Sequence, residues 1–215
     1  MAIFQRLLYL NARVTKLYNL SIMGLAKLKT KISVEDYLEG EKISPVKYEF
    51  VYGEVYAMAG TSDKHNFIAG SIYATLFNHL KNSRCEPFMG DIKVRANPDV
   101  YYYTDVLVSC EENPPNQYFR NKPILIVEVL SPSTQEIDRR EKLLFYQQMP
   151  SVQEYAIVEQ EKMHVEIHRR QPDGRWITYY FNQNADEEVE FQSVELTMTL
   201  GEIYRRVKFG NEILQ

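Results

Sequence analysis

Two acidic residues interrupt stretches of the chain that are otherwise apolar or aromatic. Asp105 lies within residues 101–108, and Glu128 lies within residues 124–130. A carboxylate in such a stretch is costly to remove from water unless a cation receives it. Since the two stretches are expected to form neighbouring strands, one shared divalent metal ion would receive both. Two carboxylates and water suit Mg²⁺ or Mn²⁺, which prefer oxygen ligands. The pattern therefore predicts an enzyme with a metal site at Asp105 and Glu128.

Each acid also has a structural alternative. Glu128 would be explained by a buried ion pair with an Arg or Lys from a covering helix. Asp99 competes with Asp105 for the metal role, but it lies in a turn before the strand, where turn chemistry explains it. Asp105 has no such explanation, and the two-residue period of a strand places it mid-strand on the same face as Tyr103 and Leu107.

The elements that must position these acids follow from periodicity and capping signals. A long helix is predicted at 64–81, with apolar residues at a spacing of four. The run at 123–130 is typical of a central strand covered on both faces. The predicted core order is helix, three strands, helix, strand, at residues 64–81, 87–95, 101–110, 123–130, 135–148 and 154–159.

Further elements are predicted at both ends of this core. Ser33 and Ser133 begin capping-box patterns, the first for a helix ending at Gly40 and the second for the helix at 135–148. Tight turns predict two hairpins, one around Tyr52–Gly53 and one around 172–174. The remaining expectations are a loop at 111–122, a strand at 194–199 and a helix at 201–207.

Composition restricts the class of protein. The chain has 215 residues, of which 45% are hydrophobic and 13% aromatic, which favours a folded globular domain. The order of predicted helices and strands makes this an α/β domain. No apolar run is long enough to cross a membrane. The two cysteines, Cys85 and Cys110, form no zinc-binding pattern, and such sparse use predicts a reducing cytoplasm.

Charge is distributed unevenly along the chain. Residues 1–31 hold six Lys or Arg and no acid, so 19 of the 25 basic and all 29 acidic residues lie in 32–215, a balance of −10. We therefore predict a basic extension at 1–31, of which 1–22 are a marginal helix or an over-long start, followed by one domain at 32–215. The acidic body disfavours tight, non-specific binding of nucleic acid.

The residues around Asp105 and Glu128 resemble the Uma-two family. This is a mostly bacterial group of expected endonucleases in the PD-(D/E)XK, restriction-endonuclease-like superfamily. The resemblance covers about residues 33–207, and its most specific part is Glu-Val-Leu-Ser-Pro-Ser-Thr at 128–134. Other matching residues are Tyr48, Glu49, Gly53, Glu54, His65, Asp105, Asp138, Lys142, Tyr146, Glu154 and Tyr155.

The resemblance implies a fold, a reaction and roles for residues. It implies a restriction-endonuclease-like core and Mg²⁺- or Mn²⁺-dependent hydrolysis of phosphodiester bonds in DNA, with metal ligands at Asp105 and Glu128. A homodimer would offer a duplex two active sites. The superfamily lysine normally stands at the position of Leu130, and Lys142 on the next helix is the matching residue. Thr104 replaces the proline that the family usually has before its metal aspartate.

Several further side chains are candidates with weaker support. Lys142 shares a helical stripe with Asp138 and would either stabilise developing charge or form a surface ion pair with Asp138. His65 points inward from the long helix, either as a core residue or as a group that positions substrate. Glu49 is the better family match of the two acids beside the Tyr52–Gly53 turn, the other being Glu54. Asp91, expected on the first core strand, is a weaker candidate for the same pocket.

Two other classes of function compete with a DNA endonuclease. A non-catalytic module that binds nucleic acid or protein would fit the net negative charge of residues 32–215. Such a module has little reason to keep Asp105 and Glu128, whose carboxylates are costly to remove from water. A phosphodiesterase acting on a small nucleotide would need less positive charge. A fold alone does not decide among these functions.

Overall fold

The computed structural model of the protein describes residues 31–132 and 134–209. These residues belong to two compact units, with the division between Met58 and Ala59. The basic extension predicted at 1–31, of which 1–22 are expected to be a marginal helix or an over-long start, lies outside the described residues except for Lys31. The predicted domain boundary after residue 31 stays a prediction.

The first unit contains a short helix and a hairpin, as predicted. Its elements are α2 (Val34–Glu41), β1 (Tyr48–Val51) and β2 (Glu54–Ala57). The Ser33 side chain caps α2 by accepting a hydrogen bond from the Asp36 N–H at 3.0 Å. The hairpin turns at Tyr52 and Gly53, which both have positive φ, 48° and 89°. Positive φ at both central residues is the geometry of the tight hairpin turns that match strand twist.

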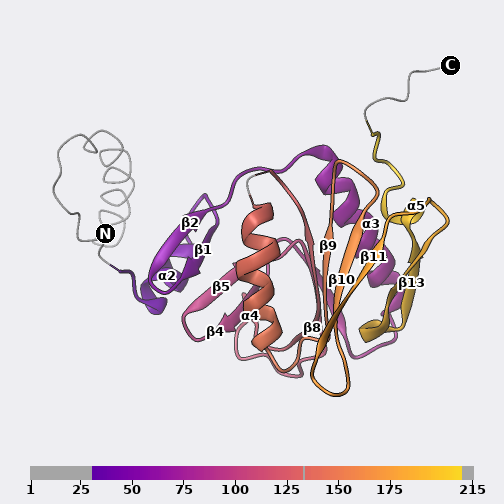
Figure 1. The fold of residues 1–215 in the computed structure, drawn as a ribbon. Coiled ribbons are helices and arrows are strands. Elements are labelled where there is room, and N and C mark those ends of the chain that lie inside the picture. Colours follow the sequence, from indigo (N-terminus) through magenta and orange to yellow (C-terminus); the bar gives the residue numbers. More distant parts are fainter. Residues whose placement is uncertain (1–30, 133, 210–215) are drawn as a thin grey trace. The chain divides into compact units, whose positions relative to one another are not determined.

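The second unit is built on a six-stranded sheet (Figure 1). The strand order is β11-β10-β9-β8-β6-β3, and the neighbours are antiparallel except for the parallel pair β8 and β9. The strands are β3 (Glu86–Met89), β6 (Val106–Ser109), β8 (Pro123–Val129), β9 (Glu154–Val158), β10 (Val165–Arg170) and β11 (Trp176–Phe181).

Helices cover opposite faces of this sheet. Figure 1 shows α3 (Asp63–His79) and α4 (Leu143–Gln148) with strands between them, and α4 continues a π-helix, η1 (Ile137–Lys142). Ile68 and Ile72 of α3 belong to the core that also contains Val127 and Val129 of β8. Since side chains alternate along a strand, Glu128 faces the other way, toward η1 and α4.

Smaller elements complete the second unit. β4 (Lys93–Asn97) lies between β5 (Val100–Tyr103), which is antiparallel to it, and β7 (Phe119–Arg120), which is parallel. The chain ends in β12 (Glu188–Phe191), η2 (Gln192–Val194), β13 (Leu196–Thr199) and α5 (Leu200–Ile203). In the part of the chain that the structure describes, no helix is long and apolar enough to cross a membrane.

Two of the predicted core strands are each divided in two. The strand expected at 87–95 forms β3 and β4, and the strand expected at 101–110 forms β5 and β6. β3 pairs with β6 and β4 with β5, so both long strands break at the same level. Gly90, with φ of 68°, donates its N–H to the Asp105 carbonyl at 3.1 Å across this break. The mid-strand placement of Asp105 was therefore wrong, because Asp105 lies in the break itself.

Other differences from the predicted elements are local. β7 lies inside the segment expected to be a loop, β12 was not predicted, and α5 is shorter than the expected helix at 201–207. The helix expected at 135–148 begins as η1, and its N-cap residue Glu136 makes no side-chain capping bond. The capping role predicted for Ser133 lies outside the described residues.

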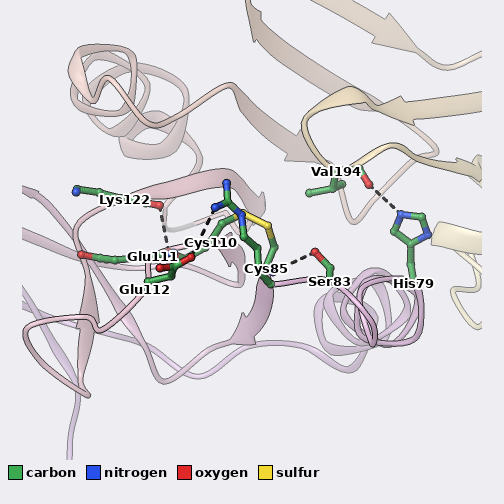
Figure 2. The surroundings of a disulfide bond; sticks show 10 residues. His79, Ser83, Cys85, Cys110, Glu111, Glu112, Lys122 and Val194 are labelled. Carbon is green, nitrogen blue, oxygen red and sulfur yellow. Dashed lines mark hydrogen bonds and ion pairs between the residues drawn. A yellow bond between two sulfur atoms is a disulfide. The ribbon is translucent and has the colours of Figure 1, made fainter.

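A disulfide joins Cys85 and Cys110, a pairing that the sequence analysis did not predict. Glu86 of β3 pairs with Ser109 of β6, so the cysteines come one residue beyond this pair and lie opposite each other (Figure 2). The bond therefore clamps the edge strand β3 to β6, the strand that follows Asp105.

We expect this disulfide to stabilise the folded chain. Its ends are 25 residues apart in sequence, and closing a loop of that size typically stabilises a protein by about 2–4 kcal/mol. Urea unfolding of the wild type should show that loss of stability when a reductant is added. The double variant Cys85→Ser/Cys110→Ser should match the reduced wild type and ignore the reductant. Equal stability of oxidised and reduced wild type would contradict the expectation.

Candidate functional site

The structure brings Asp105 and Glu128 side by side. β6 and β8 pair with Val106 opposite Val127, which places the residue before β6 beside Glu128. The Val129 N–H donates to Asp105 Oδ2 at 2.7 Å, and the Asp105 N–H approaches Glu128 Oε2 at 3.4 Å. The break before β6 leaves the Asp105 side chain 21% exposed, whereas that of Glu128 is 5% exposed. Solvent therefore reaches the pair from the Asp105 side.

Lys142 extends from η1 to the same acids. Its Nζ lies 3.0 Å from Glu128 Oε1, 3.1 Å from Asp138 Oδ1 and 3.4 Å from the Tyr103 carbonyl. The ion pair with Asp138 that was considered as a surface alternative does exist, but it is buried and includes Glu128. The wide turn of the π-helix carries Asp138 and Lys142, and such turns often occur at functional sites.

Three carboxylates gather at this site. Asp105 lies beside His65, and Glu128 and Asp138 both lie beside Lys142. The Asp138 side chain is 2% exposed, and its contact with Lys142 offsets part of the cost of burying its charge. Carboxylates this close together repel one another, so the arrangement favours an added cation.

Tyr155 lies beneath these carboxylates and is fully buried. Its hydroxyl donates to the Asp138 carbonyl at 3.1 Å. Burial raises the pKa of Tyr155 well above its ordinary value, and the negative charges of Glu128 and Asp138 raise it further. Tyr155 therefore stays protonated and serves as a hydrogen-bond donor that supports η1.

His65 contacts the metal candidate Asp105 directly. Its Nε2 lies 3.1 Å from Asp105 Oδ2, the same oxygen that accepts the Val129 N–H. Burial acts to lower the pKa of His65, but the hydrogen bond and charge of Asp105 outweigh burial and raise this pKa above its usual value of 6.5. His65 is thus buried as expected of a core residue, yet its polar contact is with the site.

A short chain of hydrogen bonds ties His65 to the end of β8. Ser62 caps α3 by accepting the His65 N–H at 3.1 Å and donates to Gln160 Oε1 at 2.5 Å. Gln160 in turn donates to the Leu130 carbonyl at 2.9 Å. Nothing in the sequence indicated the role of Gln160, because its partners come from distant segments.

The remaining acidic candidates belong to other elements of the chain. Glu49 and Glu54 lie on β1 and β2 of the first unit, where Glu49 pairs with Tyr56 across the hairpin. Tyr56 donates its hydroxyl to Glu54 at 2.9 Å. Asp91 lies in the turn between β3 and β4, not on a strand as expected, and donates its N–H to the Met89 carbonyl. Their proposed roles stay predictions.

A second group of possible metal ligands lies on the same sheet. Glu159, His164 and Glu166 each place a ligand atom within 4.8 Å of the others. Arg139 pairs with Glu166 and, at 2.9 Å, with Glu159. Burial acts to lower the pKa of Arg139, but both carboxylates raise it overall, so its charge is secure. The chain itself thus supplies a cation to this group.

Comparison with solved structures identifies the architecture. The chain resembles a crystal structure described as "a putative nuclease belonging to DUF820" from Anabaena variabilis, with a TM-score of 0.65. The match covers 81% of this chain and 98% of the other at 18% sequence identity. It confirms the predicted restriction-endonuclease-like α/β fold class.

Comparison of sequences identifies relatives and a family. Two Synechocystis proteins, slr1290 and sll1609, both described as uncharacterized, are 33% and 32% identical to this chain. The matches cover 83% and 77% of this chain and 94% and 97% of the relatives. The Uma2 family, described as "Putative restriction endonuclease", matches residues 34–201. With a family match over most of its length, and with Asp105, Glu128 and Lys142 gathered at one site, the chain belongs to the Uma2 family.

Proposed function

We propose that the protein is a metal-dependent endonuclease that hydrolyses phosphodiester bonds in DNA at Asp105 and Glu128. The observation that carries the proposal is the convergence of Asp105, Glu128 and Lys142 at one place, open to solvent on the Asp105 side. In a family described as putative restriction endonucleases, neighbouring carboxylates of this kind would hold a divalent cation beside a phosphate.

The donor atoms fit Mg²⁺ or Mn²⁺. Asp105 and Glu128 would hold the ion, since both ions prefer carboxylate oxygens and water. Among the described residues, the bonds to the Asp105 carboxylate fall on Oδ2, which keeps Oδ1 available to an added ligand. A bound ion would lower the pKa of its water and neutralise the phosphate.

The side chains of the protein supply position and charge. Glu128 and Asp138 fix the Lys142 ammonium in a buried place, where it would stabilise negative charge that develops on the phosphate. His65 and the Val129 N–H orient the Asp105 carboxylate through Oδ2. His65 thus acts as a positioning residue, and Glu49 of the first unit is a further candidate to assist.

DNA is proposed as the substrate because the family and the structural neighbour are described as nucleases. The acidic balance of residues 32–215 favours two alternatives, a binding module and a phosphodiesterase for small nucleotides. The buried carboxylates weigh against a binding module. A cytoplasmic location stays a prediction. The Cys85–Cys110 disulfide weighs against it, because disulfides are more typical of oxidising compartments.

Plasmid nicking tests the proposed reaction. Wild-type protein should relax supercoiled plasmid with Mg²⁺ or Mn²⁺ and stop when EDTA is added. Glu128→Gln and Lys142→Met should each lower the rate by about 10²-fold or more, the size typical for loss of a charge-stabilising group. Glu136→Gln is the matched control, since Glu136 is exposed and, among the described residues, pairs with Arg140 at 3.4 Å.

Two results would contradict this proposal. If Glu128→Gln and Lys142→Met nick plasmid as fast as Glu136→Gln, the site is not where the reaction occurs. If the wild type leaves plasmid intact but hydrolyses bis-p-nitrophenyl phosphate with the same dependence on Glu128, the substrate is a small phosphodiester and not DNA.

The raised pKa of His65 predicts how stability depends on pH in metal-free protein. Because protonated His65 is favoured in the fold, its contribution is fully present below the unfolded pKa of 6.5 and is lost as pH rises through the higher folded pKa. With EDTA present, the wild type should lose stability above pH 6.5 relative to His65→Gln. His79→Gln serves as the control. Urea unfolding across this range that gives parallel curves for wild type and His65→Gln would refute the assignment.

A further inference from the structure

The two edges of the six-stranded sheet differ in how they are protected. β3 at one edge contains Glu86 and Pro87 and is clamped by the disulfide at Cys85. Charged residues and proline are common devices that prevent another strand from pairing with an edge, and proline has no N–H to offer. β3 is therefore a closed edge.

The opposite edge, β11, carries none of these devices. Its six residues are Trp-Ile-Thr-Tyr-Tyr-Phe, with no charge and no proline. All six pair with β10 on one side, and β11 ends the strand order, so no other strand of the described residues pairs with its outer side. Ile177 and Tyr180 are 40% and 60% exposed. An uncharged apolar edge of this kind is open to pairing.

We propose that β11 pairs with β11 of a second copy of this chain, antiparallel and across a two-fold axis at Thr178. Even-numbered side chains lie on one face of the strand and odd-numbered ones on the other. An axis at Thr178 preserves the faces and sets Trp176 of one copy opposite Tyr180 of the other. It likewise sets Ile177 opposite Tyr179, and Thr178 opposite itself.

These cross-strand pairs are chemically matched. Aromatic pairs, aromatic pairs with β-branched residues, and Thr–Thr pairs each stabilise a sheet, and no like charges meet. The strand thus supplies both halves of the interface, which favours a second copy over a different partner. A two-fold contact uses the same surface of both copies, so it leaves no second β11 edge to bind a third copy. Because β3 at the other edge is protected, assembly stops at a dimer in which the two sheets form one continuous sheet.

Molar mass by light scattering after size exclusion tests this interface. Wild type should elute as a dimer, and Ile177→Lys/Tyr180→Lys should raise the dissociation constant at least tenfold. Ile137→Lys/Leu144→Lys is a matched control, because those residues are 39% and 60% exposed on the η1–α4 helix and add the same charge. Circular dichroism should show that all the variants are folded.

Cross-linking tests the position of the axis. Thr178→Cys should form a disulfide between two copies under mild oxidation with diamide, because the residue on the axis faces itself. Thr197→Cys, on the exposed side of β13, should not cross-link. A monomeric wild type, a dimer that survives Ile177→Lys/Tyr180→Lys, or dissociation caused by the helix control would each overturn the proposed interface. Absence of the Thr178→Cys cross-link would overturn its register.

Discussion

The buried contact of Lys142 with Glu128 and Asp138 is the interaction on which the second unit depends. Each of these charges would be costly to bury at that depth without the opposite charge beside it. The contact also joins two elements, since Glu128 comes from β8 and Lys142 from η1. It therefore fixes the helix on the sheet at the place where chemistry is proposed.

The rest of the site is arranged around that contact. Both long strands break at the same level, and the Gly90 N–H bridges the break by donating to the Asp105 carbonyl. This break brings Asp105 to the solvent-exposed side of Glu128. His65 then reaches Asp105 from the opposite helical layer, held by the cap at Ser62. Three carboxylates thus gather around Lys142 and His65, and a separate group of two carboxylates pairs with the guanidinium of Arg139.

The sequence predicted those features that depend on local pattern. The helical stripe beginning at Ile68, the Tyr52–Gly53 turn and the apolar strand around Glu128 each follow from short-range periodicity or turn chemistry, and the structure contains all three. The proximity of Asp105 and Glu128 was also anticipated, because two acids in neighbouring apolar strands suggested one cation that receives both.

Features set by distant contacts could not be predicted in the same way. Nothing in the identity of Thr104 marks a strand break, since the break follows from β5 and β6 joining different neighbours. The formation of the disulfide was equally unpredictable, because the register of β3 against β6 decides whether Cys85 and Cys110 lie opposite each other. Periodicity placed Asp138 and Lys142 on one stripe but could not show that the stripe would be buried against Glu128.

The central claim is that Asp105 and Glu128 hold a divalent cation, and anomalous scattering from crystals grown with Mn²⁺ tests it most directly. We expect a strong Mn²⁺ peak within about 2.2 Å of a carboxylate oxygen of each residue. That peak should disappear in Glu128→Gln and persist in Glu136→Gln. A peak at Glu159, His164 and Glu166 instead, or no peak beside Asp105 at saturating Mn²⁺, would contradict the claim.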